Sequence, residues 1–155
     1  MVALRQIRHY ITSTSVDPAT AEFDFNLGLD EAAVIKAVEY TIAAYAMASG
    51  VAGLYQGWLS LDRDVDTVAE AIESDDVILL AIAMAEWLTE TNGTGLVRGH
   101  QYGLYNYPDG VITAENAIMG AVAAADAKVT FYLCLFYDVI KVTPGQAVGL
   151  IARRR

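Results

Sequence analysis

The sequence contains little cysteine, histidine or positive charge for its 155 residues. The single cysteine, Cys134, excludes an intramolecular disulfide framework and suits a small buried residue on a strand. The two histidines, His9 and His100, are too few for a histidine-based metal site, and neither has a second ligand at short spacing. A chain of this length buries enough surface to fold without such a staple. We therefore expect a single domain over residues 1–155, with no cofactor.

Positive charge is scarce and unevenly placed. Ten basic residues stand against 19 acidic ones, and the net charge of −9 argues against a general nucleic-acid-binding protein. No acidic residue precedes Asp17 or follows Asp138. Half of the basic residues lie near the two ends: Arg5, Arg8, Arg153, Arg154 and Arg155. These arginines are either a solvated tail or a set that faces polyanion or lipid headgroups on one side of an assembly.

Catalytic motifs are also lacking. No glycine-rich phosphate loop follows a predicted strand, no serine sits in a nucleophile elbow, and no carboxylates form an obvious acid–base pair. We therefore expect no enzymatic activity.

One acidic stretch matches part of a calcium-binding loop. At the spacing of positions one, three, five and twelve stand Asp62, Asp64, Asp66 and Glu73. Thr67 occupies the position that requires glycine, and the preceding segment predicts a strand where the calcium motif has a helix. We interpret the stretch as a solvated acidic loop, which leaves these four residues as weak metal candidates.

Residues 41–59 carry no charge and contain the Gly53-xxx-Gly57 spacing found in paired membrane helices. However, Gly50 and Gly53 also predict a loop between two strands. The first fifteen residues lack the continuous apolar core of a signal peptide. A small membrane-associated protein therefore stays open as an alternative.

Alternating apolar and polar residues over 23–29 predict the first half-buried strand, and residues 30–33 resemble a cap and a single helical turn. Residues 54–61 predict a strand, followed by a short amphipathic helix over 65–73. Two further runs, 34–45 and 76–89, could each be strand or helix. In the first, the clustering of Val, Tyr, Thr and Ile favours a strand.

The stretch "KVTFYLCLFYDVIKV", residues 128–142, is apolar on both alternating faces. A strand of this kind must be covered twice, by the facing sheet and by something outside. Because burying the Asp138 carboxylate would be costly, we expect Tyr132 and Phe136 to face outward with it, and Phe131 to face the core. The outer cover would be another subunit or the C-terminal helix, so we expect an obligate oligomer.

The aromatic residues before this strand also suggest an interface. Pro108-Asp109-Gly110 predicts a turn before a strand over 111–122, and residues 123–127 predict a bend. Tyrosine is favoured at interfaces, because it joins a large apolar body to a polar tip. The candidate interface residues are Tyr102, Tyr105, Tyr107, Tyr132 and Phe136.

The two ends of the domain read differently. Residues 1–16 form an N-terminal segment, and residues 143–155 form a C-terminal helix with a basic tail. Thr143 fits the N-cap of this helix and Pro144 its first position.

With seven to eight predicted strands and no alternation of strands with helices, the chain is expected to be all-β, an antiparallel β-sandwich of the single jelly-roll type.

Three stretches resemble one family. "YPDGVITAENAIMG" and "KVTFYLCLFYDVIKVTPGQAVGLIARRR" resemble the C-terminal half of single jelly-roll capsid proteins of small icosahedral archaeal and bacterial viruses, and "EFDFNLGLDEAAVIKAVEYTI" resembles their first strands. The resemblance covers residues 20–152 and implies an eight-stranded sandwich that assembles into a closed shell. It offers no catalytic residues to carry over.

The same resemblance implies copies of the chain as partners, with room for a second capsid protein, and a location in the virion after synthesis in the host cytoplasm. Many RNA-virus capsid proteins carry a long arginine-rich arm, whereas the short N-terminal segment of this chain holds only Arg5 and Arg8. Weak contact of the basic termini with genome or internal lipid fits better than genome condensation. The alternative is an oligomeric β-sandwich binding module of a fibre or surface protein.

Overall fold

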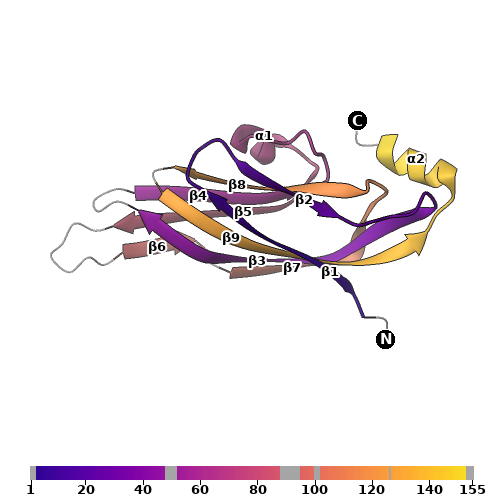
Figure 1. Ribbon diagram of the computed structural model, residues 1–155, viewed down its shortest axis with the longest axis horizontal. Coiled ribbons are helices and arrows are strands. Elements are labelled where there is room, and N and C mark those ends of the chain that lie inside the picture. The colour runs from indigo at the N-terminus through magenta and orange to yellow at the C-terminus, as the bar shows by residue number, and fades with distance from the viewer. Residues whose placement is uncertain (1–2, 48–51, 88–94, 100–101, 126, 153–155) are drawn as a thin grey trace.

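The computed structural model describes residues 3–47, 52–87, 95–99, 102–125 and 127–152. Within these residues, nine strands form two antiparallel sheets that pack face to face (Figure 1). Sheet I has the order β1 (Arg5–Ser13), β9 (Ala127–Lys141), β3 (Glu31–Met47) and β7 (Tyr102–Thr113). Sheet II has the order β2 (Ala19–Asp24), β8 (Ala117–Ala125), β4 (Ala52–Ser60), β5 (Val77–Trp87) and β6 (Gly95–Gly99).

The strand order is that of a jelly roll. The chain crosses between the sheets after β1, β2 and β3, and again after β6, β7 and β8. The resulting orders, β1-β9-β3-β7 and β2-β8-β4-β5, are the two four-stranded sheets of that fold, with β6 added at one edge. The predicted all-β sandwich is therefore confirmed.

The core lies between the inner faces of the two sheets. Phe131 of β9 is completely buried there, with its neighbours on the same face. The inner face of β9 consists of Val129, Phe131, Leu133, Leu135 and Tyr137, as the alternation of that strand predicted. Tyr55 and Leu59 of β4 pack against this face from sheet II. The predicted inward and outward faces of β9 are thus confirmed.

A second apolar cluster covers the outer face of sheet II. Helix α1 (Val68–Glu73) buries Ala71 against Trp58 of β4 and Ala121 of β8. The Trp58 indole donates a hydrogen bond to the Val65 carbonyl at 3.2 Å, so its polar atom is satisfied on burial. The predicted helix over 65–73 is therefore confirmed, with a later start.

Both ambiguous runs are strands. Residues 34–45 belong to β3 and residues 76–89 contain β5. The uncharged segment 41–59 is divided between β3 in sheet I and β4 in sheet II, with residues 48–51 outside the described part. Of the helices in the described residues, none has the length and apolar character needed to cross a membrane.

The start of the fold differs from the prediction. Residues 5–13, assigned to an N-terminal segment, form edge strand β1 along β9. Strand β2 spans Ala19–Asp24, so it begins and ends earlier than the predicted strand over 23–29. The predicted helical turn at 30–33 is wrong, because Glu31 already begins β3 and pairs with Lys141 of β9. Pairing with a neighbouring strand satisfies the backbone there better than one isolated helical turn.

Pro108-Asp109-Gly110 does not separate two strands. It lies within β7 as a bulge, because Asn106 and Val111 pair with Ala37 and Ile35 of β3 and leave residues 107–110 between them. Gly110 supplies the positive φ of 74° that the bulge needs. The chain reverses instead between Thr113 and Ala117, which divides the predicted strand over 111–122. In the predicted bend over 123–127, β8 continues to Ala125 and β9 begins at Ala127.

Helix α2 (Pro144–Ala152) follows β9 as predicted. The Thr143 hydroxyl accepts a hydrogen bond from the Gln146 N–H at 3.3 Å, and the Gln146 side chain accepts one from the Thr143 N–H at 2.8 Å. This reciprocal capping box fixes the helix start. The terminal arginines 153–155 lie outside the described residues.

Candidate interaction surface

The outer face of sheet I carries an ordered grid of side chains, here called the outer patch. Strand pairing places residues side by side in three rows across β1, β9, β3 and β7. The rows are Tyr10, Tyr132, Thr41 and Tyr102; Arg8, Cys134, Glu39 and Leu104; and Gln6, Phe136, Ala37 and Asn106. At about 4.8 Å between strands and roughly 7 Å between rows, the grid covers about 14 Å in each direction.

The outer patch exposes large apolar side chains. The exposed fractions are 71% for Tyr10, 55% for Tyr102 and 48% for Leu104. The rings of Tyr10 and Tyr132 lie 5.1 Å apart between centroids. Tyr132 and Phe136 are half-buried in the isolated chain. Tyrosine, phenylalanine and arginine, which gather on this sheet face, are residue types enriched at protein–protein contact surfaces.

Cys134 and Tyr132, which lie on β9 in the middle of the outer patch, are uncharged at neutral pH. Burial raises the pKa of the Cys134 thiol, so this cysteine stays protonated and unreactive. Burial, followed by the hydrogen bond with Cys134, raises the pKa of Tyr132 to about 12. Arg8 and Glu39 lie on either side of Cys134, on the two neighbouring strands. This arrangement suits apolar packing flanked by polar groups. It does not favour nucleophilic chemistry at Cys134.

The structure divides the predicted interface residues. Tyr102, Tyr132 and Phe136 come together in the outer patch. Tyr105 lies on the other face of β7, where its ring stacks on that of Tyr40 with 6.2 Å between the ring centroids. Tyr107 points between the sheets, where its hydroxyl donates a hydrogen bond to the Ile78 carbonyl. Burial raises the pKa of Tyr107 to about 12. Tyr107 therefore ties sheet I to β5, and its predicted place in an interface stays a prediction.

The interface prediction did not include Tyr10, Leu104 or Arg8, which also lie in the outer patch. Tyr10 and Arg8 reach the patch only through β1, which the sequence analysis did not identify as a strand. The apolar–polar alternation of Ile7, His9 and Ile11 with their neighbours was the available signal.

The basic residues of β1 are exposed. The Arg8 guanidinium donates a hydrogen bond to the Gln6 side chain at 2.6 Å. Arg5 pairs with Tyr137 near the end of β9, so β1 begins at the end of the sandwich where α2 follows (Figure 1). Arg5 thus lies at the end of the sandwich where α2 begins.

The acidic stretch after β4 is stabilised by local hydrogen bonds. The Asp62 carboxylate accepts the Asp64 N–H at 2.9 Å. Thr67 caps α1 in a capping box with Glu70, whose pKa is lowered by the hydrogen bonds from Thr67 and Asp66. Across the part of the chain that the structure describes, no three His, Cys, Asp or Glu side chains form a group that could hold a metal ion. The four weak candidates, Asp62, Asp64, Asp66 and Glu73, are included in that finding.

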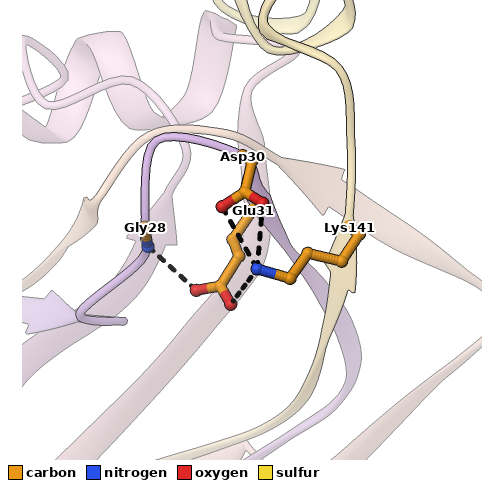
Figure 2. Close-up of polar contacts among 4 residues, drawn as sticks. All are labelled: Gly28, Asp30, Glu31 and Lys141. Atoms are coloured by element: carbon orange, nitrogen blue, oxygen red, sulfur yellow. Dashed lines mark hydrogen bonds and ion pairs between the residues drawn. The ribbon is translucent and has the colours of Figure 1, made fainter.

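An exposed ion-pair cluster joins the start of β3 to the end of β9 (Figure 2). Lys141 Nζ lies 3.0 Å from Asp30 Oδ2 and 3.2 Å from Glu31 Oε1. Glu31 also accepts the Gly28 N–H at 2.9 Å. These contacts lower the pKa values of both carboxyls and raise the pKa of Lys141. The cluster is a clamp between chain segments on the surface.

A groove of about 460 Å³ lies beside this clamp, between α2 and sheet I. Ile112, Ile140 and Leu150 supply its apolar lining. Among the residues that line it, none belongs to the three rows of the outer patch. Helix α2 therefore lies over one end of sheet I, where Ile112 and Ile140 stand, and away from the outer patch.

No protein-family model matches this chain, and no curated protein matches it.

Proposed function

We propose that the protein is the structural subunit of a viral capsid, which self-assembles into a closed shell. Jelly rolls also occur in lectins and cupins, so this fold by itself assigns no function. The observation that carries the proposal is the outer patch, where Tyr10, Tyr102 and Leu104 stay exposed on one face of sheet I. Clustered apolar side chains of this kind mark association sites.

The chain's own helix leaves this face open. Helix α2 packs beside Ile112 and Ile140, at the end of sheet I. The remaining cover for Tyr132 and Phe136 is a neighbouring subunit, which fits the two-sided apolar pattern of β9. A shell repeats such contacts in every copy. Copies of the chain are the expected partners, and a second capsid protein could join them.

The exposed arginines of β1 suggest a minor second role. Arg5 and Arg8 stand in a segment without acidic residues, and an anionic surface such as genome or internal lipid would attract them. In the proposed function the protein resides in the virion after synthesis in the host cytoplasm.

Electron microscopy of the purified, concentrated protein tests the proposal. Closed particles are expected from the wild type, and discrete small oligomers would favour an oligomeric binding module of a fibre or surface protein instead. Leu104→Glu places a charge in the outer patch and should reduce particle yield. Leu29→Glu is the matched control, because Leu29 is 96% exposed outside the patch. A protein that stays monomeric at every concentration would contradict both functions.

A further inference from the structure

Strand β1 presents an open edge. Among the described residues β1 pairs only with β9. The backbone N–H and C=O groups along its other edge therefore form no hydrogen bonds to a neighbouring strand. In Figure 1, β1 and β2 run along the near side of the sandwich. β1 is nine residues long and contains neither proline nor glycine. An edge of this length is a template for pairing with another strand.

The other edges of the two sheets are shortened or interrupted. β7, at the far edge of sheet I, contains Pro108, which has no N–H, and the bulge of residues 107–110. In sheet II, β2 has six residues and β6 has five. Glu22 on β2 is also ion-paired with Arg63. Short strands, proline, bulges and charges are the devices that prevent edge pairing, and β1 shares only the charges.

The sequence of β1 is complementary to itself. Residues opposite one another in an antiparallel ladder share a face, so a symmetric pair of β1 strands must be centred on a residue. A pair centred on His9 aligns all nine residues and places Ile7 opposite Ile11 of the second copy. It also places Arg8 opposite Tyr10, where a guanidinium can stack on the ring. A pair centred on Arg8 would oppose two arginines directly, which is unfavourable.

We propose that β1 is a self-association site, at which two copies of the chain pair antiparallel around His9. The pairing joins two four-stranded copies of sheet I into one continuous eight-stranded sheet. It also brings the two outer patches side by side through the Arg8 and Tyr10 positions. The contact is isologous, with a two-fold axis at His9. This inference goes beyond the proposed function, because the dimer forms whether or not a shell follows.

Disulfide trapping tests the register. Opposite residues in an antiparallel pair have Cα atoms about 4.5–5.5 Å apart, within the roughly 4.4–6.8 Å range of disulfides. His9→Cys should therefore give a covalent dimer under mild oxidation. Arg5→Cys is the control, because Arg5 faces Ser13 of the second copy and should stay uncrosslinked. Wild type should also stay uncrosslinked, since Cys134 is buried. Equal trapping of Arg5→Cys, or trapping of Tyr10→Cys in place of His9→Cys, would overturn the proposed register.

A charge pair tests the contact without a covalent bond. Tyr10→Glu places a carboxylate opposite Arg8 and should keep or tighten the dimer, whereas Tyr10→Lys opposes two positive charges. Because two equivalent cross-strand pairs change together, we expect the dimer dissociation constants of the two variants to differ by roughly tenfold. Light scattering measures the dimer, and circular dichroism checks that both variants fold. If Lys and Glu weaken association equally, the contact is apolar docking of the outer patch and the β1 pairing is wrong.

The same samples separate this inference from the shell. Dimers without particles would refute the proposed function and leave the β1 pairing intact. Particles formed by His9→Cys that contain no covalent dimer after mild oxidation would do the reverse.

Discussion

The backbone of Gly57 in β4 lies against the ring of Phe131 in β9. A Cβ added at position 57 would stand 3.0 Å from Cδ1 and 3.1 Å from Cε1 of that ring. The two residues come from opposite sheets, so the missing side chain of Gly57 gives the aromatic ring its place in the core. The Gly53-xxx-Gly57 spacing, which is also typical of membrane helix pairs, thus lies in a strand of a sandwich.

Gly57→Ala should destabilise the fold. The added methyl group has to displace the Phe131 ring in a closely packed core, and overpacking of this kind costs about 1–3 kcal/mol. Urea unfolding monitored by circular dichroism measures the loss, and adding Phe131→Leu should recover part of it. Gly145→Ala in α2 is the control, because nothing lies within 4 Å of the new Cβ. Equal stability of Gly57→Ala and wild type would show that the ring has free room.

The two phenylalanines of β9 should respond differently to truncation. Phe131 is fully buried in the core, so Phe131→Ala should lose about 3–5 kcal/mol of a domain stability of roughly 5–15 kcal/mol and yield misfolded subunits. Phe136 lies half-buried in the outer patch, so Phe136→Ala should fold but assemble poorly. Circular dichroism and particle yield are compared for both variants. If neither substitution changes assembly, the outer patch is not an assembly contact.

The exposed clamp at Lys141 should give a small contribution to stability that depends on pH. The hydrogen bond from Lys141 is the largest cause of the lowered Asp30 pKa, and for Glu31 it ranks after the bond from Gly28. Lowered carboxyl pKa values stabilise the fold above the ordinary carboxyl range, and this gain is lost as the pH falls through the lowered values.

Lys141→Ala should therefore melt at a lower temperature than wild type near neutrality, and the difference should disappear in strong acid. The raised Lys141 pKa predicts a similar loss of the difference in strong alkali, as the pH rises through the raised value. Thermal melts over a pH series measure both, with Lys128→Ala as the control at the other end of β9. A difference that does not change with pH would argue against the ion pairs.

Tyr107 should stabilise the fold through its hydroxyl group. Tyr107→Phe leaves the Ile78 carbonyl without this hydrogen bond, which should cost about 0.5–1.5 kcal/mol. Tyr102→Phe is the matched control, since Tyr102 is exposed on the outer face of the same strand. Equal unfolding free energies for the two variants would mean that the bond between β7 and β5 contributes nothing.

The outer patch was predictable only in part. The aromatic content of residues 102–107 and of β9 pointed to Tyr102, Tyr132 and Phe136, which do come together. It did not distinguish Tyr107, because whether a side chain points outward or between the sheets depends on the bulge at 107–110. Tyr10 was missed because its place beside Tyr132 results from pairing between the two ends of the chain.

Local signals in the sequence were sufficient where the physical cause is local. The alternation over β9, together with Asp138, determined which face of the strand is buried, because an unpaired carboxylate cannot be placed in an apolar core. Thr143 and Pro144 determined where α2 begins, because helix capping involves only residues within one turn. The all-β class likewise follows from alternation repeated along the chain.

Strand order and register were decided only by the tertiary structure. Backbone hydrogen bonds between strands are the same for every sequence, so the choice of neighbours depends on which faces can be buried together. Pairing with β9 drew Glu31 into β3 despite its helical signal, and pairing with β3 kept Pro108 and Gly110 within one strand as a bulge. In both places a buried ladder satisfied more backbone groups than the local preference could.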